Sequence, residues 1–312
     1  MLIFHFNKGF SKLLICGGYP TQYKDTCEVI NLESSTTTCK NPPNFPAKLE
    51  GAIGGIGFKG KAIICGGDQN GAYTNRCYSL ENNEWVPSDS MNSARAYASA
   101  AQLQDGKILV TGGSTGGLAF LKTAEMLVEE EWENTIPSLT VTIGDHCMVT
   151  VNSTTVMAIG GFQNGQRSGK TFYFTFGEES WTEGPELKSK RACHSCGRIR
   201  RAEGSQEMSI IVAGGVGENI LSSVEILDEG SNEWQSGPRF PFGISWSQMI
   251  EDQNGGVVLV GGQSLSNPYH DSIYQLPHGG PDAVWTEMEQ KLKTGKSHHT
   301  AFLVPNNLVE CF

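Results

Sequence analysis

The sequence predicts an all-β domain built from six similar repeats. Three observations predict it: a high glycine content, six Gly-Gly pairs at a regular spacing, and a tryptophan that follows most of the pairs at a near-constant distance. Glycine accounts for 38 of the 312 residues, against a usual share of about 7%, and only 18% of the residues are charged. This composition is typical of many short strands joined by tight turns.

Each Gly-Gly pair ends a short apolar run, and the second glycines are 49, 46, 48, 54 and 47 residues apart. A regular period of this length indicates a repeat architecture. The longest step contains the polar segment 200–207 (RRAEGSQE), which we interpret as a surface loop, where insertions cost little. The pairs are Gly17 and Gly18, Gly66 and Gly67, Gly112 and Gly113, Gly160 and Gly161, Gly214 and Gly215, and Gly261 and Gly262.

A tryptophan follows five of the pairs, 18, 19, 20, 19 and 23 residues after the second glycine. The first repeat has Cys39 instead, at a distance of 21 residues. Between the glycines and the tryptophan lies a short segment of alternating apolar and polar residues, clearest at 223–228, which predicts a half-buried strand. With an apolar run before each Gly-Gly strand, every repeat reads as four strands. The tryptophans are Trp85, Trp132, Trp181, Trp234 and Trp285.

These residues resemble the kelch repeat over nearly the whole chain. The resemblance rests on the Gly-Gly pair, a glutamate in the third strand and the spaced tryptophan. It implies a β-propeller, in which four-stranded sheets pack as blades around a central channel. One such sheet cannot bury both faces, but six sheets in a ring can. The fifth repeat matches best, at Gly214, Gly215, Val224, Glu225, Asn232 and Trp234.

We therefore expect one domain, residues 1–312, that forms a six-bladed propeller of four antiparallel strands per blade, closed by a C-terminal strand. Residues 299–304 read as an inner strand that completes the first blade, although residues 1–6 compete for that place. The glycines allow positive φ and close approach, and each tryptophan fills the wedge between blades. The expected repeats are 1–40, 41–86, 87–133, 134–182, 183–235 and 236–286, followed by a closing segment at 287–312.

The charge balance limits the partners. The formal net charge is −10, with 23 basic and 33 acidic residues, and no basic run occurs. We therefore expect no nucleic-acid binding and no association with anionic membranes. No stretch is long and apolar enough for a membrane helix, and we expect no signal peptide. A protein, a peptide or a small polar ligand remains as the partner, bound by a chain that we expect to be monomeric.

Strand parity predicts a binding face. In antiparallel blades, the loops between second and third strands share a face with the links between blades, and variable loops on a rigid scaffold usually carry recognition. Arg95, Arg191 and Lys296 precede inner strands near the channel, with Arg239 nearby. This cluster would suit an acidic peptide. In the alternative interpretation these cations satisfy loop carbonyls and carboxylates. If they bind the partner, charge reversal at Arg95 and Arg191 leaves melting unchanged and abolishes capture.

Aromatic side chains form the second feature of this face. Tyr73, Phe120, Phe162 and Tyr269 all lie in loops between second and third strands. Aromatic residues often anchor interfaces, but loop aromatics also fold back over the underlying blade. The sequence leaves both interpretations open.

Enzyme chemistry finds little support, and we predict no catalytic residues, no metal site and no cofactor. Copper oxidases resembling galactose oxidase carry a Tyr-His pair at an inner strand, and no repeat here combines the required residues. The segment 193–196 (CHSC) suggests zinc, but residues three apart on a strand point to opposite faces. No nucleophile elbow and no phosphate-binding glycine loop occurs.

Nine cysteines leave at least one unpaired. Cys16 and Cys27, and likewise Cys65 and Cys77, span one loop between adjacent strands and are candidate disulfides. These pairs and the sequon at 152–154 favour an oxidising compartment, whereas the expected absence of a signal peptide favours the cytoplasm, which we predict.

Three functions follow. The first is a non-enzymatic scaffold that binds proteins or peptides, such as the substrate-recognition part of a ubiquitin-ligase adaptor. The second is a secreted or cell-surface interaction domain with disulfides. The third and most distant is a copper-radical oxidase.

Overall fold

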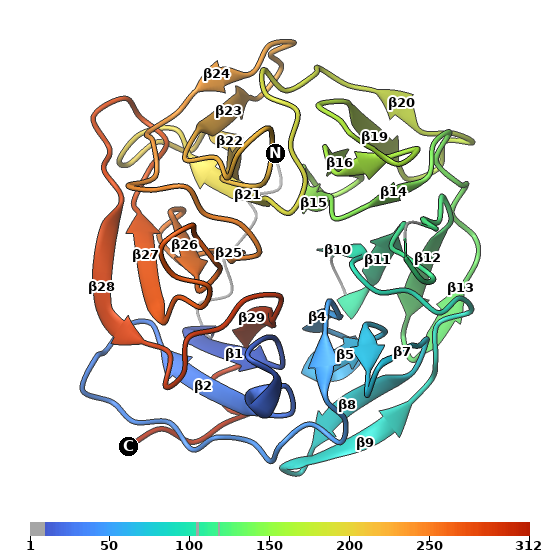
Figure 1. The fold of residues 1–312 in the computed structure, drawn as a ribbon, viewed down its shortest axis with the longest axis vertical. Coiled ribbons are helices and arrows are strands. Elements are labelled where there is room, and N and C mark those ends of the chain that lie inside the picture. The colour runs from blue at the N-terminus through green and yellow to red at the C-terminus, as the bar shows by residue number, and fades with distance from the viewer. Residues whose placement is uncertain (1–9, 104–105, 118) are drawn as a thin grey trace.

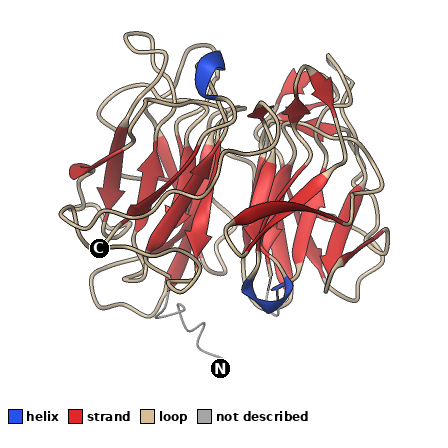
Figure 2. Ribbon diagram, turned by 90° about the horizontal axis from the view of Figure 1, so that it is seen from below, coloured by secondary structure: helices blue, strands red, loops and turns tan. Residues whose placement is uncertain are grey.

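A computed structural model describes residues 10–103, 106–117 and 119–312. Its sheets lie in a ring around a central opening (Figure 1). Seen from the side, the strands run between two loop-bearing ends, and the two short 3-10 helices sit at opposite ends (Figure 2). These helices are η1 (Thr21–Tyr23) and η2 (Phe58–Gly60). No helix in the described ranges is both long and apolar enough to cross a membrane.

Strands of the described residues form eight antiparallel sheets, consistent with propeller blades. Five sheets have four strands, which follow one another in chain order as the repeats predict. These are β4 (Ile53–Ile56), β5 (Ala62–Cys65), β8 (Cys77–Glu81) and β9 (Glu84–Ser88); β10 (Ser99–Gln102), β11 (Ile108–Thr111), β12 (Ala124–Val128) and β13 (Glu131–Glu133); β15 (Cys147–Thr150), β16 (Thr155–Ile159), β19 (Thr171–Thr175) and β20 (Thr182–Glu183); β21 (Ser195–Arg200), β22 (Met208–Ala213), β23 (Val224–Asp228) and β24 (Gln235–Ser236); and β25 (Gln248–Glu251), β26 (Val257–Val260), β27 (Ser272–Leu276) and β28 (Thr286–Lys291).

The sixth large sheet joins the two ends of the described chain. It contains β2 (Cys27–Asn31), β1 (Lys12–Cys16) and β29 (Thr300–Val304), in that order. β29 lies antiparallel to β1, with Leu14 opposite Phe302. The C-terminal strand therefore pairs with the first repeat, as expected for residues 299–304. The competing segment, residues 1–6, lies outside the described residues.

Two small three-stranded sheets lie among the loops. Each pairs a link between large sheets with the hairpin of a loop between second and third strands. The pairing confirms that these two kinds of loop share one face. The small sheets contain β3 (Leu49–Glu50), β6 (Asp68–Gln69) and β7 (Ala72–Tyr73), and β14 (Ile143–Gly144), β17 (Phe162–Gln163) and β18 (Gln166–Arg167).

The Gly-Gly pairs have the predicted conformation. All twelve glycines have positive φ, between 59° and 100°. The second glycine of each pair donates its N–H to a carbonyl of the following link, as Gly215 does to Ile244 at 2.7 Å. A Cβ on Gly214 would collide with that same carbonyl oxygen, so glycine is required both for the backbone conformation and for the close approach.

The tryptophans pack between sheets. Trp234 is completely buried against Val149 and Met157 of the preceding sheet and Val212 of its own. Four of the five repeat tryptophans also donate their indole N–H to a proline carbonyl in the preceding link, which meets the need of a buried N–H for a partner. The bonds run from Trp85 to Pro43 (3.0 Å), Trp181 to Pro137 (2.8 Å), Trp234 to Pro185 (2.9 Å) and Trp285 to Pro238 (3.0 Å).

Eight of the nine cysteines, all of which lie in the described ranges, form four disulfides. The two predicted pairs, Cys16–Cys27 and Cys65–Cys77, are bonded, each between directly opposed residues of neighbouring strands. Two pairs were not predicted. Cys39 bonds Cys311 across 272 residues, and Cys147 of β15 bonds Cys196 of β21 on the neighbouring sheet. Cys193 is buried and free.

Candidate binding face and channel mouth

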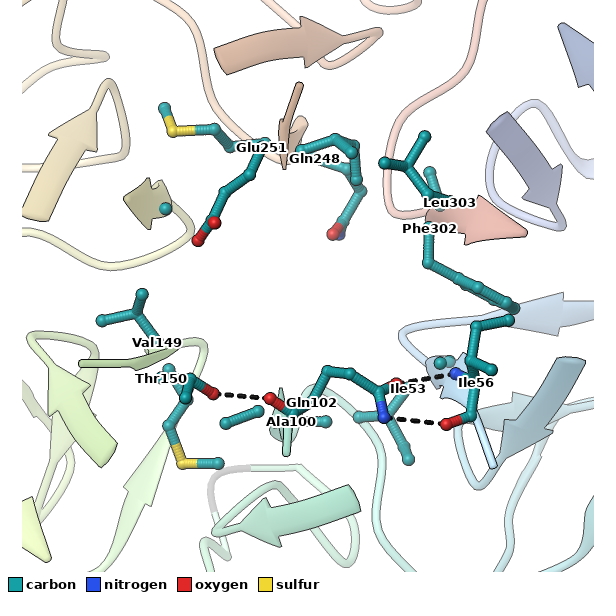
Figure 3. Close-up of a pocket in the computed structure, with 18 of the residues that line it drawn as sticks. Ile53, Ile56, Ala100, Gln102, Val149, Thr150, Gln248, Glu251, Phe302 and Leu303 are labelled. Atoms are coloured by element: carbon teal, nitrogen blue, oxygen red, sulfur yellow. Dashed lines mark hydrogen bonds between the residues drawn. The ribbon is translucent and has the colours of Figure 1, made fainter. Parts of the chain in front are cut away.

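The inner strands of the six large sheets surround a channel of about 1150 Å³. These strands are β4, β10, β15, β21, β25 and β29, and Figure 1 shows them nearest the central opening. Figure 3 shows Gln248 and Glu251 pointing into the channel, while Gln102 turns aside and bonds both backbone groups of Ile56, each at 2.7 Å. Gly54 and Gly55 also line the channel, and the side chains of Phe302 and Gln102 pack closely against them.

The predicted cations of the binding face are buried within the sheets. Arg95 and Arg191 are 1% and 0% exposed, and Lys296 is 1% exposed. Arg191 donates to the carbonyls of Gly214 (2.7 Å) and Ser223 (3.1 Å) and to Glu225 (2.7 Å). Arg95 repeats this arrangement with Gly112, Thr123 and Glu125, and Lys296 bonds the carbonyls of Gly17 and Tyr23. This geometry matches the alternative interpretation, in which the cations satisfy carbonyls and carboxylates.

The third-strand glutamates complete these clamps. Glu225 also accepts the N–H groups of Lys188 (2.7 Å) and Ser189 (3.0 Å) from the link that precedes it. Desolvation lowers the pKa of Arg191 and of Arg95, although the neighbouring carboxylates oppose the shift. Burial therefore removes Arg95, Arg191 and Lys296 from the candidate surface. Arg239 stays exposed and donates to the Ser222 hydroxyl at 2.7 Å.

The predicted loop aromatics are half-buried and belong to separate groups. Phe120 and Phe162 stack at 5.9 Å, with the Arg167 guanidinium 5.5 Å from the Phe162 ring. Tyr73 lies edge-on to Tyr97, 6.1 Å away. Tyr269 sits on the loop after β26, near the link at Gly295. The four side chains are thus spread around the face rather than gathered into one patch.

Six of the described residues form a closed ring around the channel mouth, on the face that carries the loops between second and third strands. Each residue precedes an inner strand and has left-handed backbone, with φ between 50° and 59°. Each donates its backbone N–H to the carbonyl of the ring residue before it. The bonds run from Tyr97 to Gly51 (2.7 Å), Asp145 to Tyr97 (3.0 Å), Cys193 to Asp145 (2.8 Å), Trp246 to Cys193 (3.0 Å), His298 to Trp246 (3.2 Å) and Gly51 to His298 (3.1 Å).

Aromatic side chains crowd this mouth. His298 stacks on Trp246 with ring centroids 3.9 Å apart, and Tyr97 meets both rings edge-on at 5.8 and 6.3 Å. Tyr19 meets His298 edge-on at 5.3 Å. We call Tyr19, Tyr73, Tyr97, Trp246 and His298 the mouth cluster; all five are half-buried.

Two carboxylates lie within the mouth. Glu50 accepts hydrogen bonds from the Tyr97 hydroxyl and the Lys24 ammonium, and these bonds lower its pKa despite the opposing effect of burial. Asp145 is different, because its enclosed Oδ1 has no hydrogen-bond partner among the described residues. Desolvation raises the pKa of Asp145 from 3.8 to about 7. His298 is neutral near pH 7, because desolvation lowers its pKa to about 4.

A cavity of about 90 Å³ lies at the mouth and shares several lining residues with the channel. Its walls include Tyr97, Asp145, Cys193, Trp246 and His298 of the ring. These residues do not stand out as a group in the sequence. Their register could have revealed them, since Tyr97, Cys193 and His298 each stand two positions after an aligned cation.

The residues do not fit a metal centre. No group of three His, Cys, Asp or Glu side chains in the described ranges could hold a metal ion. The candidate ligands have other roles: Cys196 is bonded to Cys147, and His270 stacks on Phe242 at 4.9 Å. His194 is buried, and a Cβ on Gly160 would meet its imidazole.

Comparison with known proteins identifies the fold. No protein-family model matches the chain. Galactose oxidase of Gibberella zeae is 34% identical over 67 residues, which are 22% of this chain and only 10% of that protein. The solved structure of YjhT, a kelch-repeat propeller protein, covers 89% of this chain and 94% of its own, with a TM-score of 0.74 and 14% identity. These likenesses show a kelch-type β-propeller fold.

Proposed function

We propose that this chain is one six-bladed kelch-type propeller, closed by β29, that binds a protein or peptide without catalysing a reaction. The closed ring of six backbone hydrogen bonds supports the blade number, since each large sheet contributes one ring residue. The pairing of β29 with β1 supports the mode of closure. A substrate-recognition role in a ubiquitin-ligase adaptor is one form of this function.

The observation that carries the binding role is the different placement of the basic and the aromatic side chains. Within the repeats, the guanidinium groups of Arg95 and Arg191 are hydrogen-bonded inside the sheets. At the loop face, half-exposed aromatic side chains remain, such as Phe162 and Trp246. Aromatic side chains of this kind dominate the binding energy of interfaces. The expectation of an acidic partner rested on four cations, and the burial of Arg95, Arg191 and Lys296 leaves only Arg239 exposed to support it.

The four disulfides favour the second candidate as the setting of this function. Disulfides persist in oxidising compartments and are rare in the cytosol. We therefore favour a secreted or cell-surface binding domain over the cytoplasmic location expected from the sequence. A copper oxidase remains the distant alternative, and metal analysis with an absorption spectrum of the purified protein tests it.

Selection from a random peptide library tests the binding role. Peptides selected on the wild-type protein should lose binding to a Phe162→Ala or Trp246→Leu variant of the loop face. They should keep binding to Lys59→Glu, an exposed change in η2 at the opposite end. A selection that yields no specific binder, or binders sensitive only to Lys59→Glu, would refute the proposal.

A further inference from the structure

We propose that the channel mouth binds a positively charged amine, presented as the lysine side chain of a partner peptide. This inference deepens the proposed function and rests on it. It assigns the central part of the loop face, where ring residues surround the small cavity. The partner is therefore basic at the contact point, contrary to the acidic peptide that the sequence suggested.

The lining of the mouth has the chemistry that recognises an ammonium group. Tyr97, Trp246 and His298 all line the cavity, and their rings meet one another. Aromatic faces attract cations through their quadrupole, and tryptophan does so most strongly. His298 adds an aromatic ring without adding positive charge, since it is neutral near pH 7.

An unpaired carboxylate supplies the opposite charge. Asp145 lines the same cavity, and its enclosed Oδ1 lacks a hydrogen-bond partner among the residues described. A buried polar atom without a partner is costly, and native proteins rarely leave one unsatisfied. An ammonium group carries three N–H donors and no acceptor, so one placed in the cavity would pair its charge with the Asp145 carboxylate.

The mouth already accommodates one ammonium group. The Lys24 Nζ lies 4.0 Å from the centre of the Tyr19 ring and bonds Glu50, which also accepts the Tyr97 hydroxyl. This contact combines an aromatic face with a carboxylate. The Asp145 side of the mouth has the same two components, but no cation of this chain is paired with the Asp145 carboxylate among the described residues.

Size and overall charge agree with this occupant. A cavity of about 90 Å³ has room for roughly three water molecules at about 30 Å³ each, which suits an ammonium group and its last methylene. The net charge of −10 also attracts basic partners over a distance. An acidic side chain at the same place would face Asp145 and Glu50.

The test uses four peptides that differ at one central residue: lysine, trimethyl-lysine, norleucine or glutamate. Binding to the 312-residue protein is measured by calorimetry, with methylammonium chloride as a competitor. The lysine peptide should bind at least tenfold more tightly than the norleucine peptide, and the glutamate peptide more weakly still. The trimethyl-lysine peptide keeps the positive charge but has no N–H donor and a larger head group, so it should bind less tightly than the lysine peptide. Methylammonium should compete with the lysine peptide, and the same concentration of sodium chloride should compete less.

Three variants locate the site. Asp145→Asn and Trp246→Leu should each reduce the preference for lysine over norleucine at least fivefold. Phe162→Leu is the matched control on the same face, in the separate stacked pair with Phe120, and should keep the preference.

The outcomes separate the two proposals. If all four peptides bind equally tightly and Phe162→Leu weakens them, the loop face binds peptides and the cation site is refuted. If none of the four binds, the cation site is also refuted, and the library selection alone decides the proposed function. A lysine preference that survives Asp145→Asn would place the charge recognition elsewhere.

Discussion

Asparagine in place of Asp145 should stabilise the protein at alkaline pH but much less at acidic pH. The folded-state pKa is about 7 against a reference value of 3.8, because the carboxyl is desolvated at the channel mouth. Between these values the folded state holds a proton that the unfolded state has released. The free energy of unfolding therefore falls as pH rises through this window, and it stays low above pH 7.

The magnitude follows from the shift. Three pKa units correspond to about 4 kcal/mol of lost stability above pH 7, since one unit is worth about 1.4 kcal/mol. At pH 5 the wild-type protein has already lost about 1.5 kcal/mol of this, so the advantage of Asp145→Asn should grow by about 2.5 kcal/mol between pH 5 and pH 8. Asparagine tolerates left-handed backbone, and the variant therefore adds little strain at φ 50°.

Urea unfolding at pH 5 and pH 8 measures this change, with the disulfides intact. The comparison between variant and wild type cancels the buried histidines, which titrate in both proteins. For a chain of 312 residues, 2.5 kcal/mol corresponds to a rise of about 4 °C in Tm. Asp271→Asn, the same substitution at an exposed position, is the matched control. An advantage that is the same at both pH values, within 0.5 kcal/mol or so, would refute the reasoning.

Four further predictions follow from the structure. Trp234→Ala should destabilise the protein by about 3–5 kcal/mol in urea unfolding, because it empties a wedge between sheets, and Trp234→Phe should cost less. Arg191→Ala should cost about 3–5 kcal/mol by leaving Glu225 buried and unpaired, whereas exposed Arg239→Ala should stay within about 0.5 kcal/mol; equal effects would contradict the clamp. A thiol count on denatured, non-reduced native protein should give one thiol, Cys193, and nine would indicate a reducing compartment. The lysine peptide should bind more tightly at pH 8 than at pH 6, because Asp145 loses its proton in that range. The other groups near Asp145 keep their charge state, since Tyr73 and Cys193 remain protonated and Glu50 and Lys24 remain charged. An affinity that is the same at both pH values would argue against Asp145 as the counter-charge.

The repeat could be predicted from the sequence because the fold imposes the same local demand six times. Gly214 must have positive φ and lie against the carbonyl of Ile244, so only glycine fits, and the requirement is visible as a residue type. Trp234 likewise is completely buried between two sheets, a position that a large apolar side chain suits. Positions at which the backbone geometry requires one residue type can therefore be recognised in the sequence.

The candidate site could not be predicted in the same way, because a residue type alone does not fix its surroundings. The arginines at 95 and 191 look like surface cations in the sequence, yet their guanidinium groups turn into the sheet and bond the carbonyls around the Gly-Gly turn. Charge reversal there would bury two carboxylates side by side, so we now expect melting to change strongly. The Cys39–Cys311 pair could not be predicted for another reason. The two residues are 272 positions apart, and the sequence pattern does not show that they lie close together.

The six ring residues at the channel mouth share one backbone conformation, but their side chains differ from repeat to repeat. The hydrogen bonds of the ring are entirely backbone to backbone, so these bonds themselves do not require particular side chains at the six positions. Left-handed backbone favours glycine, and other residues pay roughly 1–2 kcal/mol in that conformation. Gly51 avoids this strain, but Tyr97, Asp145, Cys193, Trp246 and His298 do not. Strain that several neighbouring residues retain at one opening is a reason to look for function there. The five side chains converge on one cavity, and the desolvated Asp145 adds a second cost at the same place. A partner that supplies a cation would offset that second cost, which is why the mouth, rather than the buried arginines, is where recognition should be sought.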